Sequence, residues 1–459
     1  MAAAVVAVAA AAVAAAVVVS AETALGIAWR PELSWAIEKR TGITWIELLA
    51  ENLPANNILP KPIQVLQERG ARTALHGVSL SLGGAERPNA DRLKRLAELA
   101  LASNAQLVSE HLAFVRADGI ESGHLLPLQR RRDAIKLIVE NIQIAQAALP
   151  VPLAVENIAS LFRYPDEALS EAEYLRAILE SANCLLLLDV SNLHANSINY
   201  GFDAVNVLDE LPLERIAYVH IAGGVIRDGF YHDTHAHPIG GAPIDLLTEL
   251  CKRVAPPAVI LERDDSFPTE DELDAELEAI KAAIGTGLQA AVPTSAAAVR
   301  IGSSRLVMTE LPSVRSQAVL SDLPLGGGPA FISAPVELQR SVMRCLNNGE
   351  NAPPGMDARE LTRAASTLFH KRMTVVERCH PVLAKMIGDD VHSRFRFYAR
   401  VHSLNADADG TADGYQFAMH ILAQPGAHRL RIARYILRRL LANPREWQLL
   451  FRAIRDFSH

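Results

Sequence analysis

The stretch that decides the fold reads YVHIAGGVIRDGFYHDTHAHPIGG and runs from Tyr218 to Gly241. It begins as an apolar strand pattern, and the whole stretch contains four of the chain's 15 histidines and two aspartates. Imidazole and carboxylate groups are common ligands of Zn, Fe and Mn in proteins. The stretch therefore predicts a strand that leads directly into a metal site.

The pattern of an apolar run followed by polar residues recurs along residues 25–284. Strands are expected at residues 25–30, 45–51, 73–82, 107–114, 152–158, 185–193, 216–224 and 258–265. Amphipathic segments that fit helices lie at residues 89–103, 129–148, 171–181, 242–254 and 270–284. This alternation favours an α/β fold, a TIM (β/α)8 barrel rather than an open doubly wound sheet. No glycine-rich phosphate loop follows any of the expected strands.

Polar residues lie at the carboxyl ends of six of the eight expected strands. Strand ends of a barrel converge on one mouth, so residues that are distant in sequence become neighbours there. The candidates outnumber the ligands of one ion, so two or three ions are expected, with Glu156 and Asp189 as shared, catalytic carboxylates. The metal-ligand candidates are His76, His111, Glu156, Asp189, Asn192, His220, Asp233, His235 and Glu262.

Two further residues are weaker candidates. Glu110 directly precedes His111, and a carboxylate in that position can orient a ligating ring instead of binding metal itself. His194 follows Asn192 by two positions, which places both on one strand face if the strand continues that far. We interpret His194 as a residue beside the ligands.

Seven short motifs, in this order along residues 25–284, resemble those of the multinuclear non-heme iron-dependent oxidative enzymes, the group that includes the methanobactin-biosynthesis oxidase. They are HGVSLSLG (76–83), SEHLAF (109–114), VENIAS (155–160), LDVSN (188–192), HIAG (220–223), DTH (233–235) and LERD (261–264). The resemblance implies a TIM barrel that holds two or three iron ions of mixed valence, with dioxygen as co-substrate. The implied reaction oxidises a residue, usually cysteine, in a ribosomally made precursor peptide.

The resemblance also implies which residues bind each ion. Three groups follow from it, namely His76, His111 and Glu156; Asp189, His220 and Glu262; and Asn192, Asp233 and His235. Cys184 precedes a strand and Cys251 lies on an expected helix, so a thiolate at the metals would come from the peptide. It would bind an iron with an open position before hydrogen abstraction.

This chain departs from the family pattern at two places. The family commonly has a second histidine where this chain has Gly224, and often a histidine in the turn at residues 199–201. These departures affect the expected substrate more than the expected metal cluster. His232 and His237 could replace the missing imidazole, but we interpret them as ordinary loop histidines.

Composition limits the remaining functions. A formal net charge of -7 argues against a nucleic-acid-binding protein that relies on phosphate contacts. Four cysteines without a CxxC pair favour a reducing, cytoplasmic setting. The first 21 residues are almost entirely Ala and Val and lack the positive charges of a secretory signal. Residues 1–24 are therefore interpreted as a low-complexity extension, and no membrane segment is expected.

Beyond the barrel, residues 285–333 fit a linker and residues 334–459 a small all-α domain. The domain is interpreted as a fused peptide-recognition partner, by analogy with the separate partner proteins of the family. Arg431, Arg434 and Arg438 share one helix face that suits an acidic leader peptide or is simply solvated. A zinc site from Cys345, Cys379, His370 and His380 is less expected than a core role for the cysteines.

Two other functions remain open from the residues. A TIM-barrel isomerase or hydrolase, similar to xylose isomerase or endonuclease IV, also gathers His, Glu and Asp around divalent ions at strand ends. A metal-bound module that binds peptides without catalysis is the second. The isomerase or hydrolase would be redox-silent, so metal identity separates it from the oxidative enzyme. The binding module would be favoured if substitution of Glu156 or Asp189 left peptide modification unchanged.

Overall fold

The computed structural model describes residues 23–54, 56–291, 334–402, 404–405, 410–424 and 429–457. The Ala/Val-rich residues 1–22 and residues 292–333 of the expected linker lie outside the described residues. Within the described ranges, no helix is both long enough and apolar enough to span a bilayer.

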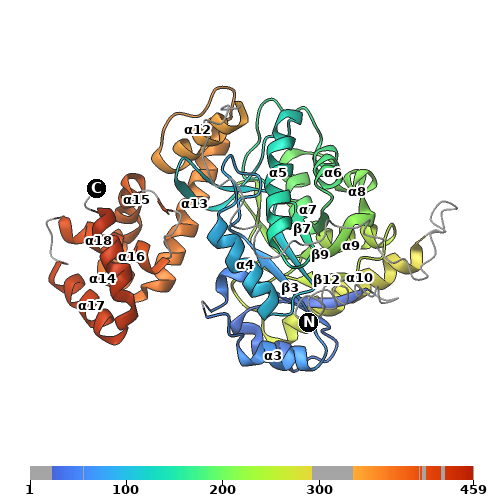
Figure 1. Cartoon of the computed structure of the whole chain (residues 1–459), viewed down its shortest axis with the longest axis horizontal. Helices are drawn as coiled ribbons and strands as arrows, with labels where there is room; N and C mark the ends of the chain where they lie inside the picture. Colours follow the sequence, from blue (N-terminus) through green and yellow to red (C-terminus); the bar gives the residue numbers. More distant parts are fainter. Residues whose placement is uncertain are drawn as a thin grey trace, which may run out of the picture.

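Eight parallel strands close into a barrel, which confirms the predicted TIM fold (Figure 1). The order around the barrel is β1-β12-β9-β8-β7-β4-β3-β2. The strands are β1 (Ala24–Trp29), β2 (Trp45–Leu49), β3 (Arg72–Gly77), β4 (Leu107–His111), β7 (Leu153–Glu156), β8 (Leu185–Asp189), β9 (Ile216–Ile221) and β12 (Ala258–Leu261). The strand register pairs His111 with Glu156 and Asp189 with His220, so polar strand ends meet at one level.

Helices cover the outside of the barrel. They are α2 (Ser34–Glu38), α3 (Lys61–Glu68), α4 (Ala90–Ala102), α5 (Arg132–Ala148), α6 (Glu171–Ala182), α7 (Val190–Tyr200), α8 (Ala204–Glu210), α9 (Gly241–Cys251) and α10 (Glu270–Ala290). The Asn89 side chain caps α4 by accepting hydrogen bonds from two backbone amides, as expected from its position. Helix α10 continues to Ala290 instead of ending at Ile284.

The strand expected at residues 185–193 is shorter than predicted. It ends at Asp189, whose side chain accepts hydrogen bonds from the backbone amides of Ser191 at 2.6 Å and Asn192 at 2.9 Å. These bonds cap α7, so the chain turns into a helix at the next residue. Asn192 and His194 therefore lie on a helix, and the interpretation of a shared strand face was wrong.

Two hairpins project from the carboxyl ends of strands. β5 (Phe114–Ala117) pairs with β6 (Ile120–Leu126), and β10 (Gly224–Arg227) pairs with β11 (Phe230–Asp233). The sequence patterns at residues 107–114 and 216–224 run through the turns that begin these hairpins. A short strand from the C-terminal region, β13 (Leu404–Asn405), extends the first hairpin to three strands.

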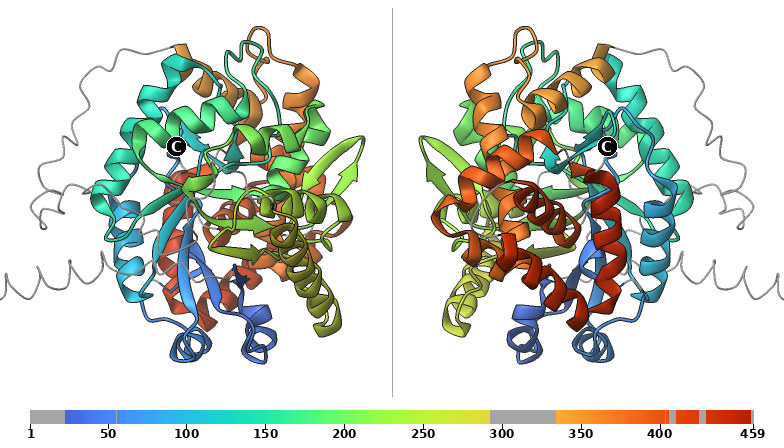
Figure 2. Two further views of the ribbon diagram at one scale, coloured as in Figure 1. Left: turned by 90° about the vertical axis from the view of Figure 1, so that its right-hand side faces the viewer. Right: turned by 90° about the vertical axis from the view of Figure 1, so that its left-hand side faces the viewer.

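The C-terminal region is helical, as predicted. Its helices are α12 (Ala334–Asn348), α13 (Ala358–Cys379), α14 (Pro381–Ile387), α15 (Val391–Val401), α16 (Gly410–Ala423), α17 (Arg429–Ala442) and α18 (Trp447–Phe457). They lie beside the barrel in Figure 1 and overlap it when the molecule is viewed from that side in Figure 2. Buried side chains up to Leu368 join the main core of the barrel, whereas those from Met373 onward form a second core. The two cores thus divide within α13, not at residue 334.

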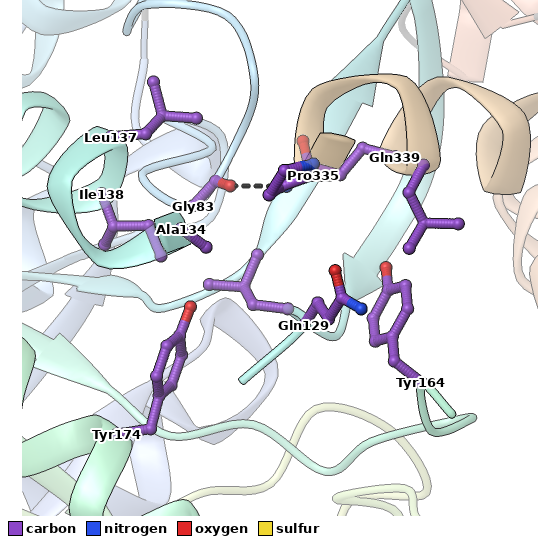
Figure 3. Close-up of a pocket in the computed structure, with 11 residues that line it drawn as sticks. Gly83, Gln129, Ala134, Leu137, Ile138, Tyr164, Tyr174, Pro335 and Gln339 are labelled. Atoms are coloured by element: carbon purple, nitrogen blue, oxygen red, sulfur yellow. Dashed lines mark hydrogen bonds between the residues drawn. The ribbon is translucent and has the colours of Figure 1, made fainter. Parts of the chain in front are cut away.

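Helix α12 is held against the barrel by buried apolar side chains, by an ion pair between Arg344 and Asp118, and by one glutamine. The Gln339 side chain donates to the Gly83 carbonyl at 2.8 Å (Figure 3). It also accepts a hydrogen bond from the Ala85 amide at 2.7 Å. Tyr164 and Tyr174 line the small pocket beside this contact. Because both ends of the amide group are paired, α12 has a defined position on the loop after β3.

Candidate metal centre

Eight of the nine metal-ligand candidates lie in groups of ionisable side chains at one end of the barrel. They form three overlapping groups whose ligand atoms lie within 4.8 Å of one another. The groups are His76, His111 and Glu156; Glu156, Asp189, His220 and Glu262; and Asp189, Asp233 and His235. Glu156 and Asp189 each belong to two groups, as expected for carboxylates that bridge metal ions.

The first group converges on one carboxylate oxygen. Glu156 Oε2 lies 3.5 Å from His76 Nε2 and 3.3 Å from His111 Nε2. It is buried and accepts no hydrogen bond from the described residues. On the far side of its ring, His76 Nδ1 lies 2.8 Å from Ser109 Oγ. This contact orients the ring so that Nε2 faces the carboxylate, as in many metal sites.

The second group surrounds His220, which is fully buried. His220 Nδ1 lies 3.2 Å from Glu156 Oε1 and 3.0 Å from Glu262 Oε2. On the opposite side, His220 Nε2 lies 2.7 Å from Glu47 Oε2, which also accepts a hydrogen bond from the Tyr218 hydroxyl at 2.6 Å. A carboxylate behind a histidine fixes the tautomer and the ring orientation of a metal ligand.

Glu47 was missed by the sequence analysis. It lies within β2, between apolar residues, and not at the strand end where polar residues were sought. Its signal was its charge, because a carboxylate inside an otherwise apolar strand is seldom buried without a partner. A search of whole strands for buried acids would have found it.

The third group lies at the end of the β10–β11 hairpin. His235 Nε2 is 2.5 Å from Asp233 Oδ2, and His235 Nδ1 is 3.2 Å from Asp264 Oδ2. Asp264 in turn accepts a hydrogen bond from Arg30 Nε at 2.8 Å. Arg30 and Asp264 were also missed, and they hold the His235 ring at Nδ1, on the side opposite Asp233. The backbone of His235 has φ 53°, a left-handed conformation that places its ring beside Asp233.

Asn192 is the ninth candidate and stands outside the three groups of ionisable residues. It lies in the first turn of α7, and its Nδ2 donates to the Asn157 carbonyl at 3.0 Å. This bond directs the nitrogen away and leaves the amide oxygen as a possible ligand atom. Ligation by Asn192 remains a prediction.

The pKa values show that the charges of the metal-free site do not balance locally. Burial lowers the pKa of His111, but the carboxylates of Glu156 and Glu110 outweigh it and raise the value to about 9. Burial, and then His111 and His220, hold the pKa of His76 well below its ordinary value. Burial raises the pKa of Asp189 far above its ordinary range, and Asp233 adds to this effect. A cation among these groups would remove the conflict between the carboxylates.

The donor set fits a metal cluster. Within the three groups, four buried atoms have no hydrogen-bond partner in the described part of the chain, namely Glu156 Oε2, Asp189 Oδ2, Asp233 Oδ1 and His111 Nδ1. Such atoms are costly unless a ligand satisfies them. Nitrogen and oxygen donors without thiolate suit Fe, Mn or Zn.

The departures from the family pattern have a structural explanation. A Cβ atom on Gly224 would lie 2.4 Å from Tyr231 Cε1 and 2.5 Å from the His232 carbonyl oxygen, so no side chain fits there. His237 Nδ1 contacts Thr234 Oγ1 at 2.7 Å. His232 and His237 belong to none of the three groups. His237 lies in a loop, as interpreted, but His232 lies on strand β11.

The C-terminal region holds no comparable group among its described residues. His380 Nδ1 contacts the Tyr435 hydroxyl at 2.8 Å, and its Nε2 contacts the Thr411 carbonyl at 2.9 Å. Both ring nitrogens are thus used in packing. The alternative zinc site with Cys345 and Cys379 gains no support from the geometry.

Known families and proteins are similar to this chain over both of its regions. A family model described as "RiPP precursor modification enzyme MbnB/TglH/ChrH" matches residues 24–285, and one described as "SCO6045-like, C-terminal domain" matches residues 336–423. A UPF0276 protein of Streptomyces avermitilis is 41% identical and covers 86% of this chain and 87% of its own length. One of Caulobacter vibrioides is 32% identical and covers 54% of this chain and 89% of its own length. A xylose isomerase domain protein from Planctomyces limnophilus has 13% identity and a TM-score of 0.41, covering 58% of this chain and 98% of its own.

Proposed function

Because the chain belongs to the family of RiPP precursor modification enzymes described as MbnB/TglH/ChrH, we propose that it oxidises a residue of a precursor peptide with iron and dioxygen. RiPPs are ribosomally synthesised and post-translationally modified peptides. Cysteine is the proposed target residue. The C-terminal region is proposed to help bind the peptide, as a partner fused to the enzyme.

The observation that carries this proposal is the sharing of two carboxylates among three ligand groups. Glu156 and Asp189 each have a buried oxygen that no described residue satisfies. The proposed ligands are the eight grouped residues and the amide oxygen of Asn192. Shared carboxylates are what a cluster of two or three ions requires, because adjacent cations need anions between them.

The side chains around the ligands prepare them for metal. Glu47 accepts from Nε2 of His220 and so leaves Nδ1 free to face Glu156 and Glu262. Bound iron would supply the electrons with which dioxygen is activated. Cys184 and Cys251 are buried and belong to no ligand group, so a thiol at the site would come from the peptide.

The test combines metal analysis with peptide mass. The full chain is expressed with a short cysteine-bearing peptide encoded beside its gene, and the peptide mass is compared with and without the chain. We expect bound iron, a paramagnetic resonance signal that changes on reduction, and a mass change that disappears when the peptide cysteine is replaced by serine.

Other results would favour the alternatives. Stoichiometric zinc and no iron signal would favour a redox-silent isomerase or hydrolase. A peptide that is modified equally well with the Glu156→Gln chain would favour a module that binds peptide without catalysis.

A further inference from the structure

Helix α13 of the C-terminal region passes over the metal-binding end of the barrel. Its Arg363 guanidinium lies 3.7 Å from the centre of the Phe230 ring. Its Arg378 Nη2 lies 3.5 Å from Asp265 Oδ2. Between them, Lys371 Nζ lies 3.2 Å from His124 Nδ1. Phe230 and His124 lie on the two hairpins that follow β9 and β4, and Asp265 lies on the loop after β12. All three strands end at or next to proposed ligands, so the helix spans the mouth.

The three basic residues of α13 share one side of the helix. Their spacings of eight and seven residues correspond to about two turns each, because a helix has about 3.6 residues per turn. The buried apolar side chains of this helix, such as Leu361 and Leu368, join the barrel core from another side. Helix α13 therefore presents cations to the mouth, while its apolar side holds it in place.

Lys371 differs from the other two cations in its surroundings. Arg363 stacks on an aromatic ring and Arg378 has a carboxylate within ion-pair distance, whereas no described carboxylate lies that close to Lys371. Its side chain is exposed to solvent. Among the described residues, its polar contact is to His124. Burial, and then the charge of Lys371, lower the pKa of His124 well below its ordinary value, so that ring is neutral. An ammonium group has three donors, so two remain for a ligand.

The neighbours of α13 place Lys371 near the third ligand group. Arg363 packs on Phe230 of β11, which ends at Asp233, and Arg378 contacts Asp265, which directly follows Asp264. Both carboxylates flank His235. A ligand held by Lys371 would therefore lie beside the proposed metal ions and under α13.

We propose that Lys371 is a substrate-positioning residue whose ammonium group binds a carboxylate of the precursor peptide beside the ligand group of Asp233 and His235. This inference rests on the proposed function, because it names a contact of the same substrate. The carboxylate belongs either to the C-terminus of the peptide or to an acidic side chain near the modified residue. The C-terminal region then completes the active site as well as binding the peptide at a distance.

The test measures binding and turnover separately. The metal-loaded full chain is titrated with the fluorescein-labelled precursor peptide encoded beside its gene, without dioxygen, and anisotropy is recorded. Lys371→Gln is expected to weaken binding about tenfold or more, since a charge-assisted hydrogen bond is lost. Lys371→Arg should restore most of the affinity. Lys385→Gln, the same change at an exposed lysine of α14, is the matched control and should bind like the unmodified chain.

Turnover then distinguishes positioning from a purely structural role. In the presence of dioxygen, Lys371→Gln should raise KM by a similar factor and change kcat far less. A peptide with a C-terminal amide tests the first source of the carboxylate, and peptides with Asp→Asn or Glu→Gln near the modified residue test the second. One of these peptides should bind equally well to the unmodified and Lys371→Gln chains.

The outcomes separate this inference from the proposed function. Peptide that binds but is never modified would overturn the proposed function and leave the role of Lys371 standing. Equal binding by the Lys371→Gln and unmodified chains would overturn the role of Lys371, whatever the activity. So would a loss of affinity that persists with every peptide whose carboxylates have been neutralised.

Discussion

The barrel mouth and the C-terminal region each contain a buried polar cluster, and the two clusters differ in how their atoms are satisfied. In the C-terminal region, Arg372 donates from Nε and Nη2 to the two carboxylate oxygens of Asp413, at 2.8 and 2.7 Å. Its Nη1 donates to the His402 carbonyl at 2.8 Å, and the Tyr398 hydroxyl also donates to Asp413. Opposite charges and donors are matched there within the protein.

At the mouth, the buried carboxylates are not all matched by donors or positive charges within the described residues. Glu156, Asp189 and Asp233 each retain a buried oxygen without a hydrogen-bond donor. A cluster that satisfies itself stabilises the fold, whereas one that leaves buried acids opposed to each other requires a ligand. Whether the buried polar atoms have partners therefore separates a structural cluster from a functional one. Residue type does not, since both regions contain acids and histidines.

The largest expected effect is on the satisfied cluster. Asp413→Asn leaves the buried Arg372 guanidinium without its anion, so the free energy of unfolding should fall by about 3–5 kcal/mol. Chemical denaturation followed by circular dichroism measures this loss. The metal content of the barrel should not change, and an unchanged stability would remove the distinction between the clusters.

Asp189→Asn should have the opposite profile. The asparagine oxygen can still cap α7, but the bridging charge is lost, and metal affinity should fall by about 100-fold, close to 3 kcal/mol. The metal-free chain should be as stable as before or more so, because burial and Asp233 raise the pKa of Asp189 and disfavour its ionised form. Anaerobic titration with ferrous ion and melting of the metal-free chain test both parts. A stability loss like that of Asp413→Asn would contradict the comparison.

A smaller effect is expected behind the ligands. Glu47→Gln keeps the size of the side chain but removes the charge that orients His220, which should reduce metal affinity about 10- to 100-fold. The control is Glu51→Gln, just beyond the same strand and outside the three groups, which should bind metal normally. Equal affinities of the two variants would show that Glu47 has no role in orienting the ligand.

The smallest effect is the pH dependence. The pKa of His111 is raised to about 9, so the metal-free fold holds a proton there that the unfolded chain has lost above about pH 6.5. Its contribution to stability is complete below about pH 6.5 and disappears as the pH rises through about 9. Metal must displace that proton, so metal affinity should rise by at most tenfold per pH unit up to about pH 9. Melting curves and metal titrations from pH 6 to 9 should thus slope in opposite directions.

Part of the site could be read from single strands. His76 and Glu156 each follow an apolar run, and His111 ends a strand that begins with one; such runs are local patterns that short segments of sequence contain. Glu47 was missed because its role depends on a partner 173 positions away, His220, which no local pattern records. Asp189 was found as an acid, but its cap on α7 was not, since an apolar run does not show where a strand ends.

The sequence by itself determined the eight strands, their closure into a barrel and the polar ends that meet at its mouth. These features follow from hydrophobic periodicity and from the parallel direction of the strands, which bring distant residues to one level. Only the tertiary structure decided which side chains orient the ligands, where the two hydrophobic cores divide and that α13 brings Lys371 to the mouth. Those facts depend on contacts between segments far apart in the chain, and such contacts are set by packing rather than by any local pattern.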